Sequence, residues 1–455
     1  MNEMLNYRLF SALLLIKINT SDNKMLLRVW GVRLMLKLWV LIIELCSLNF
    51  FKTHTVRRMS MGTVKQTIIP IKQIDRVLNP IHEATGMPNE AYTNPEYFNF
   101  ERDHVFSNTW VCVGFASDLI KNGYVMPIDF MDLPLLMMKS RQGEVQVFHN
   151  VCSHRGMKLV HEAGEVQGMI RCPYHSWTYD LNGSLKGTPH LGGIGKHNDE
   201  RFACEKHGLK AIRSAIWMDM VFINLSGEAS SFDEHIAPLT QRWQEFLGDD
   251  GLSLLRRANM GGHLEIEVKS NWKLTIENFC EAYHLPWVHP ALNTYSKLED
   301  HYNIMFDERF SGQGSYKYNL SDTAGTHLPK FPSWPEKKLR HAEYVALFPN
   351  VLIGIQADHA FAMMIDPIST DKTIERLRIF YISDEATKDE YAACRTATLE
   401  SWRVVFGEDI GAVEGMQQGR YSPGFGGGAF SPEMDTPTHF FQIWLAKQVK
   451  SVTEA

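Results

Sequence analysis

Two short segments of the chain each place a cysteine close to a histidine. The first contains Cys152 and His154, and the second contains Cys172 and His175. Thiolate and imidazole are ligands that proteins offer to zinc and to iron–sulfur clusters. Four such ligands could hold a tetrahedral zinc ion. They could also hold a [2Fe–2S] cluster in which the cysteines bind one iron and the histidines bind the other.

The distribution of the four ligands favours the cluster. Zinc sites of this composition usually carry both cysteines on one segment and both histidines on another. Here each segment carries one cysteine and one histidine. Mixed ligation of this kind is the Rieske arrangement, in which two histidines replace two cysteines and raise the reduction potential. We therefore predict a Rieske [2Fe–2S] site.

A second group of candidate metal ligands lies further along the chain. The spacing of Glu277, Glu281 and His284 predicts that they share one face of a helix. His289 would point elsewhere on a straight helix, but Pro286 interrupts the helix and could return His289 to the side of His284. Two imidazoles and one carboxylate form the facial triad of oxygen-activating ferrous enzymes. We predict a mononuclear iron site here, with a carboxylate from elsewhere in the chain.

From about residue 90 to residue 447 the chain resembles the α subunit of the Rieske non-heme iron, or ring-hydroxylating, oxygenases. The resemblance rests on both groups of ligands, on their order and spacing, and on Arg155-Gly156 and Trp177 beside the cluster segments. It implies that the two cysteines bind one iron of the cluster and the two histidines bind the other.

The resemblance also implies the third ligand of the mononuclear iron. Glu408 and Asp409 resemble the acidic pair that supplies this carboxylate in the family. Asp409 is therefore predicted to join His284 and His289 on the iron. A solvated acidic pair at the start of a helix is the alternative interpretation.

The family forms trimers in which the cluster of one subunit faces the iron of the next. A carboxylate beside the ligand histidines connects the two centres. Glu281 occupies this connecting position and could accept hydrogen bonds from His284 and from His175 of the partner subunit. Asn278 lies in the same segment, and we expect Asn278 and Glu281 to be the catalytic side chains.

The connecting segment also bears on the substrate. Naphthalene-type dioxygenases carry an aspartate at this position, with one more residue before it, whereas this chain carries Glu281 in the compact form Glu-Asn-Phe-Cys-Glu-Ala-Tyr-His. That form is similar to the oxygenases of choline, glycine betaine, stachydrine and carnitine. The predicted function is hydroxylation or N-demethylation of a quaternary ammonium compound. Aromatic ring hydroxylation is the alternative, and electron transfer without oxygenase activity is a remote alternative.

A methylammonium group is held by the faces of aromatic rings. Four aromatic side chains lie near the predicted iron site in the sequence, namely Trp272, Phe279, Tyr283 and Trp287. We expect each of them to pack in the core, so the substrate class rests on the resemblance.

The elements that must position these groups differ along the chain. Short β-type runs predominate in residues 109–225, where Asn182-Gly183 is a strong hairpin signal. Asn94-Pro95 begins a helix before them, and helical and strand-like runs mix after them. The predicted fold is α+β. A small antiparallel β Rieske domain (109–225) is inserted in a larger α+β catalytic domain (61–108 and 226–455) with a helix-bordered antiparallel sheet.

The composition is that of a globular protein from a reducing compartment, which we take to be the cytoplasm. The chain has 455 residues, a net charge of −6 and seven scattered cysteines, so neither nucleic acid nor a disulfide framework is expected. Residues 1–60 are basic, and charges at Arg33, Lys37 and Glu44 make a membrane span there marginal. We predict an extension that is not part of the folded enzyme. A membrane anchor and a targeting segment are the alternatives.

Electrons must come from a partner protein. No G-x-G-x-x-G segment follows a predicted strand, and the glycine-rich residues 424–428 are predicted to form a loop. We therefore expect a separate reductase that uses NADH or NADPH. The predicted cofactors are a [2Fe–2S] cluster and a mononuclear Fe(II). A small-molecule substrate and O₂ complete the partners, and the resemblance implies a homotrimer.

Overall fold

The computed structural model describes residues 68–318 and 327–453. The predicted N-terminal extension, residues 1–60, lies outside the described residues. Within the part of the chain that is described, no helix is both long enough and apolar enough to cross a lipid bilayer.

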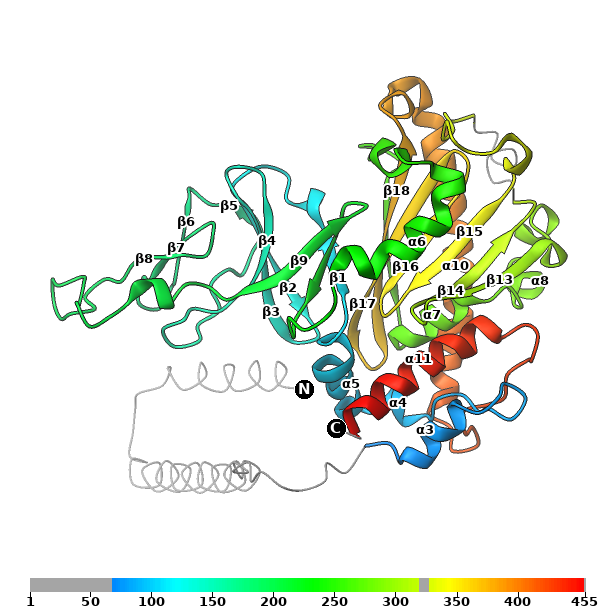
Figure 1. The fold of residues 1–455 in the computed structure, drawn as a ribbon, viewed down its shortest axis with the longest axis horizontal. Helices are drawn as coiled ribbons and strands as arrows, with labels where there is room; N and C mark the ends of the chain where they lie inside the picture. Colours follow the sequence, from blue (N-terminus) through cyan, green and yellow to red (C-terminus); the bar gives the residue numbers. More distant parts are fainter. Residues whose placement is uncertain (1–67, 319–326, 454–455) are drawn as a thin grey trace, which may run out of the picture. The chain divides into compact units, whose positions relative to one another are not determined.

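A seven-stranded antiparallel sheet and a small three-stranded sheet form the first part of the fold (Figure 1). The strand order of the first sheet is β1 (Val111–Phe115), β10 (Met220–Asn224), β9 (Ala211–Trp217), β4 (Val145–His149), β3 (Leu133–Lys139), β2 (Tyr124–Phe130) and β5 (Gly164–Glu165). The small sheet contains β6 (Met169–Arg171), β7 (Thr178–Asp180) and β8 (Leu185–Gly187). Gly183 has a φ of 80° in the turn between β7 and β8, so the predicted hairpin is confirmed.

An eight-stranded antiparallel sheet forms the second part. The strand order is β11 (Leu255–Arg256), β18 (Lys372–Ile382), β17 (His359–Ser369), β16 (Val351–Ile355), β15 (Ala342–Leu347), β14 (Phe310–Ser315) and β13 (His301–Phe306), and β12 (His263–Val268) also pairs with β18. Alternate side chains of a strand point to opposite faces. Thus Phe361 and Met363 of β17 join one hydrophobic core, and Ala362 and Met364 join another.

Helices cover both faces of this large sheet. The longer ones are α6 (Phe232–Leu247), α7 (Trp272–Cys280), α10 (Ala392–Arg420) and α11 (Thr436–Thr453). The shorter ones are α3 (Ile71–Val77), α4 (Glu90–Thr93), α5 (Pro95–Phe100), a π-helical turn η1 (Glu101–Phe106) and α8 (Leu285–Val288). The single 3-10 turns are η2 (Ala116–Asp118), η3 (Cys204–Lys206), η4 (Gly251–Leu254), η5 (Leu292–Thr294), η6 (Leu298–Asp300), η7 (Glu336–Lys338), η8 (Glu385–Thr387) and η9 (Asp389–Tyr391).

The two cores show which helix covers which face. Trp243 of α6 packs in the core that contains Ala362. Trp272 of α7 and Trp402 of α10 pack in the core that contains Phe361. The predicted α+β class, with a β domain and a helix-bordered antiparallel sheet, is confirmed. The predicted start of α5 is also confirmed, because the side chain of Asn94 accepts hydrogen bonds from the first turn of that helix.

Candidate active site

The segment that carries the predicted iron ligands is not one helix. Helix α7 begins after Asn271, whose side chain accepts a hydrogen bond from the amide of Lys273. It ends at Cys280, because Glu281 has extended backbone angles of φ −122° and ψ 159°. The prediction of a shared helical face for Glu277, Glu281 and His284 is therefore wrong.

The chain turns after Glu281 and enters α8. His284 immediately precedes this short helix, and Pro286 lies in its first turn, where a missing amide hydrogen costs no helical hydrogen bond. His289 immediately follows the helix. The two imidazole rings consequently lie with their centroids 5.1 Å apart. The expected meeting of the two histidines occurs, although Pro286 lies in the first turn of a separate short helix and does not interrupt a longer one.

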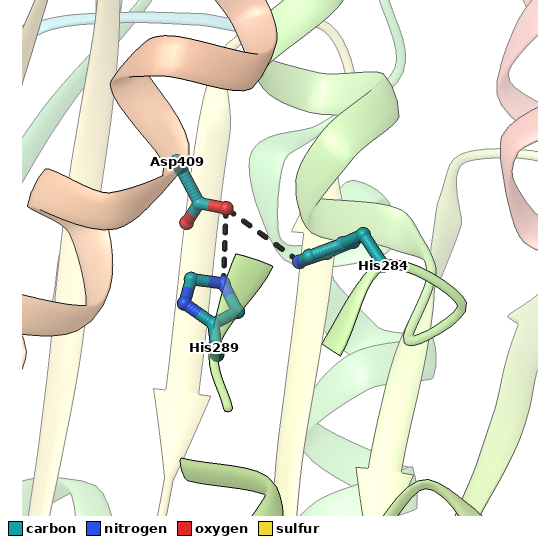
Figure 2. Close-up of side chains that lie close together, drawn as sticks. All are labelled: His284, His289 and Asp409. Carbon is teal, nitrogen blue, oxygen red and sulfur yellow. Dashed lines mark hydrogen bonds and ion pairs between the residues drawn. The ribbon is translucent and has the colours of Figure 1, made fainter. Parts of the chain in front are cut away.

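Asp409 completes the group of candidate ligands. Its Oδ1 lies 3.0 Å from Nε2 of His289 and 3.5 Å from Nε2 of His284 (Figure 2). Ligand atoms of the three residues all lie within 4.8 Å of one another. Asp409 lies in the interior of α10 and not at a helix start, so the alternative of an acidic pair at a helix start is wrong.

A second carboxylate supports each histidine from behind. Oε1 of Glu281 lies 2.5 Å from Nδ1 of His284, and Oε2 of Glu408 lies 2.8 Å from Nδ1 of His289. Each Nδ1 therefore has a hydrogen-bond partner, and each Nε2 faces Asp409. Carboxylate–histidine pairs of this kind orient imidazoles that bind metals. The supporting role of Glu408 was not predicted, and its only sequence signal is its position next to Asp409.

Carboxylates and an amide side chain surround the candidate ligands and affect their charge and orientation. Burial lowers the pKa of His289, but Asp409 and Glu408 outweigh burial and hold that pKa above its usual value. Nδ2 of Asn278 donates a hydrogen bond to Oδ1 of Asp409 over 2.8 Å, which orients the carboxylate. Two imidazoles and one oriented carboxylate are the donor set that ferrous iron takes in a facial triad. The donors present therefore fit an iron ion.

Glu277 belongs to a different group. Its carboxylate accepts a 2.5 Å hydrogen bond from Tyr92 and lies 3.8 Å from the guanidinium of Arg420. Next to it, Lys273 forms a fully buried ion pair with Glu101 at 2.7 Å. These charged residues connect α7 with α4, η1 and α10, so they hold the helix that leads to the site.

The four predicted cluster ligands lie in two similar loops. The amide of Cys152 donates to the carbonyl of Met157, and the amide of Cys172 donates to that of Trp177, so each cysteine begins a tight turn. The rings of His154 and His175 lie 4.6 Å apart. Their cysteines are buried, and Tyr179 lies 3.2 Å from Sγ of Cys152.

The imidazole nitrogens of these loops fit a metal. Nδ1 of His175 is buried and has no hydrogen-bond partner within the structure. Buried polar nitrogens are almost always paired, so this unpaired nitrogen is in a position to bind a metal ion. The ring of His154 stacks on Trp177 at 4.6 Å with an interplanar angle of 8°, which fixes its orientation. Two thiols and two oriented imidazoles are the donors that a Rieske cluster requires.

A cavity lies beside His284, His289 and Asp409. Its aromatic lining consists of Phe279, Tyr318, Tyr344, Trp402 and Phe406. Only Phe279 was among the aromatic residues that the sequence placed near the site.

The other three aromatic residues behave differently. Trp272 is fully buried in the core, as expected. Tyr283 and Trp287 are 43% and 71% exposed, so the expectation of core packing is wrong for both. Neither of these two lines the cavity.

A cysteine–histidine cluster site and a two-histidine, one-carboxylate site in one chain are the marks of an iron–sulfur-dependent, non-heme iron oxygenase. Comparison with known families agrees. Residues 109–198 match the Rieske [2Fe-2S] domain, and residues 255–451 match the catalytic domain of the ring hydroxylating alpha subunit. The chain belongs to the Rieske non-heme iron oxygenase family, whose cofactors are a [2Fe–2S] cluster and a mononuclear iron.

Similar proteins include several oxygenases of quaternary ammonium compounds. The chloroplastic choline monooxygenase of Arabidopsis thaliana is 25% identical over 386 residues, covering 82% of this chain and 84% of that protein. The oxygenase subunit of carnitine monooxygenase from Escherichia coli K12 is 24% identical over 352 residues, covering 77% of this chain and 87% of that protein. The oxygenase subunit of glycine betaine monooxygenase from Chromohalobacter salexigens is 31% identical over 218 residues, covering 47% and 46%.

Solved structures share the fold. The quaternary ammonium Rieske monooxygenase CntA in complex with L-carnitine has a TM-score of 0.65 at 22% identity, covering 84% of this chain and 99% of that one. Naphthalene 1,2-dioxygenase from Rhodococcus sp. bound to indole has a TM-score of 0.63 at 17% identity, covering 83% and 98%. The fold is therefore common to enzymes whose ligands differ widely.

Proposed function

We propose that this protein is the oxygenase component of a system that hydroxylates or N-demethylates a quaternary ammonium compound. The observation that carries the proposal is the aromatic cavity beside His284, His289 and Asp409. Among the described residues, no Lys or Arg lines this cavity. The faces of aromatic rings attract a cation without forming an ion pair, and a methylammonium group needs that kind of wall.

We assign the mononuclear iron to His284, His289 and Asp409, and the cluster to Cys152, His154, Cys172 and His175. When bound, the mononuclear iron activates O₂ and the cluster supplies electrons. The protein's own groups orient these ligands. Glu281 and Glu408 hold the two imidazoles with Nε2 toward the site, and Asn278 holds Oδ1 of Asp409. The buried aromatic walls keep water from the substrate.

The two centres are best connected between subunits. Figure 1 shows β6, β7 and β8, which flank the cluster ligands, well separated from α8. His154 is exposed and His175 is partly exposed, so another subunit can reach them. Glu281 is the candidate connection, with Tyr283 and Trp287 as exposed apolar surface beside it. We therefore propose a homotrimer in the cytoplasm that receives electrons from a separate NAD(P)H-dependent reductase.

Hydroxylation of an N-methyl carbon gives a hemiaminal, which breaks down to formaldehyde and the demethylated amine. The test is O₂ consumption and formaldehyde release by the purified protein with a surrogate reductase. The substrate panel contains choline, betaines, carnitine and simple aromatic acids. Turnover of a quaternary ammonium compound supports the proposal. Coupled formation of a hydroxylated ring from an arene alone would replace it with the aromatic alternative.

The metal assignment has its own test. His284→Ala should remove the mononuclear iron and turnover while the visible absorption of the cluster stays intact. His263→Ala, which changes an exposed histidine of β12, is the matched control and should keep both metals. Full mononuclear iron content in His284→Ala would contradict the assignment.

A further inference from the structure

A tight turn between β16 and β17 supports two walls of the aromatic cavity. The amide of Gln356 donates to the carbonyl of His359 over 3.0 Å and closes this turn. Nε2 of Gln356 donates to the hydroxyl of Tyr344 over 3.3 Å. Nε1 of Trp402 donates to Nε2 of His359 over 3.0 Å. One turn therefore holds the polar edges of two aromatic side chains whose rings line the cavity.

The hydrogen bonds determine where the protons of His359 lie. An indole nitrogen can only donate, so Nε2 of His359 must be unprotonated in order to accept from Trp402. The proton of the neutral imidazole is then on Nδ1, which donates to Oδ1 of Asp358 over 2.7 Å. His359 is fully buried and Asp358 is 4% exposed. The imidazole therefore brings no positive charge, and the carboxylate lies behind a cavity wall.

Packing fixes the ring that this pair supports. The ring of Trp402 stacks on Tyr318 at 6.0 Å and on Phe406 at 5.3 Å, with interplanar angles of 17° and 22°. Phe361 meets the same ring edge-on at 4.7 Å. The indole thus has one orientation, with its N–H directed at His359. Linked hydrogen bonds polarise one another, so the chain from carboxylate to imidazole to indole shifts electron density onto the ring.

We propose that Asp358 and His359 are positioning residues that make Trp402 select a quaternary ammonium group over an uncharged group of the same shape. A ring with greater electron density attracts a cation more strongly, while its contact with a neutral tert-butyl group changes little. The inference rests on the proposed function, because it concerns how that substrate cation is recognised. A support that served packing alone would affect both groups equally.

The test compares choline with 3,3-dimethylbutan-1-ol, in which carbon replaces the charged nitrogen. Dissociation constants for both are measured on the purified holoenzyme by isothermal titration calorimetry, independently of turnover. His359→Leu removes the acceptor of the indole, and His359→Gln retains an acceptor oxygen near the position of Nε2. We expect the preference for choline over the alcohol to fall at least fivefold in His359→Leu and to stay within twofold in His359→Gln.

Two further variants keep the test decisive if His359→Leu does not fold. Asp358→Asn retains size and removes the charge, and it should reduce the preference for choline. Trp402→Phe removes the N–H, and in that background Asp358→Asn should cause no further change in the preference. Thermal unfolding and the absorption of the cluster verify that each variant is folded.

The outcomes separate this inference from the proposed function. If the unmodified enzyme binds both ligands equally well, no selection exists and the inference is overturned, whereas the substrate class is overturned only if no quaternary ammonium compound of the panel is turned over. If the unmodified enzyme prefers choline and the folded variants keep that preference, the inference alone is overturned. Equally weaker binding of both ligands by the His359 variants would show that His359 has a purely structural role, and it would also overturn the inference.

Discussion

Removing the carboxylate of Glu408 should weaken the mononuclear iron site without removing a ligand. Its Oε2 accepts a 2.8 Å hydrogen bond from Nδ1 of His289, and the Glu408 side chain is 32% exposed. A hydrogen bond to a charged group is worth roughly 1.5–3 kcal/mol, and partial exposure favours the lower half of that range. Since about 1.4 kcal/mol corresponds to a factor of ten, we expect Glu408→Ala to reduce Fe(II) affinity by about 10–50-fold.

The assay is a titration of the iron-depleted mononuclear site with Fe(II) under anaerobic conditions, with the cluster left in place. Glu408→Gln keeps an acceptor and loses the charge, so its effect should be intermediate. Glu400→Gln is the matched control, because Glu400 lies on the same helix, is exposed and pairs only with Arg403 among its described hydrogen bonds. Glu408→Ala with an Fe(II) dissociation constant within twofold of the unmodified protein would refute the supporting role.

Three further predictions concern stability. Lys273→Met leaves the carboxylate of Glu101 buried without its cation and should cost about 3–5 kcal/mol in urea unfolding, with partial recovery when Glu101→Gln is added. Burial lowers the pKa of His235 to about 3. The unfolded chain therefore binds more protons between about pH 6.5 and pH 3, stability falls as pH decreases through that window, and His235→Asn should flatten this dependence in unfolding experiments at several pH values. Gly354→Ala places a Cβ 2.2 Å from the ring of Phe361 and should lower the free energy of unfolding by about 1–3 kcal/mol, measured by chemical denaturation.

Local sequence patterns correctly predicted the features that form between residues close together in the sequence. The side chain of Asn94 can cap a helix because the amides it bonds are two and three residues away. The hairpin at Asn182-Gly183 depends on a glycine that accepts a positive φ. The ligand types of the two iron sites were also readable, because a metal requires particular donor atoms whatever fold presents them.

The path of the backbone between His284 and His289 could not be predicted from the sequence in the same way. A spacing that suits one helical face predicts a helix only while the backbone stays helical. The backbone of Glu281 is extended, so the helix does not continue to His284. The carboxylate of Glu281 instead turns back onto His284, while Glu277 stays on α7 and contacts Tyr92. Residues distant in the sequence hold the chain here, since Gln313 donates a hydrogen bond to the carbonyl of Glu281 and Ser311 donates one to Sγ of Cys280, and no local pattern records these contacts.

The substrate walls show the same limit more clearly. Tyr283 and Trp287 lie close to the ligands in the sequence and were expected to pack in the core, but both side chains are exposed and neither lines the cavity. The residues that line the cavity come from elements that meet only in the folded sheet, such as Tyr344 of β15 and Trp402 of α10. The indole of Trp402 in turn donates its N–H to His359, the first residue of β17. A binding wall of this kind is a property of strand order and helix placement, so its recognition requires the structure, whereas the iron sites require only the donors.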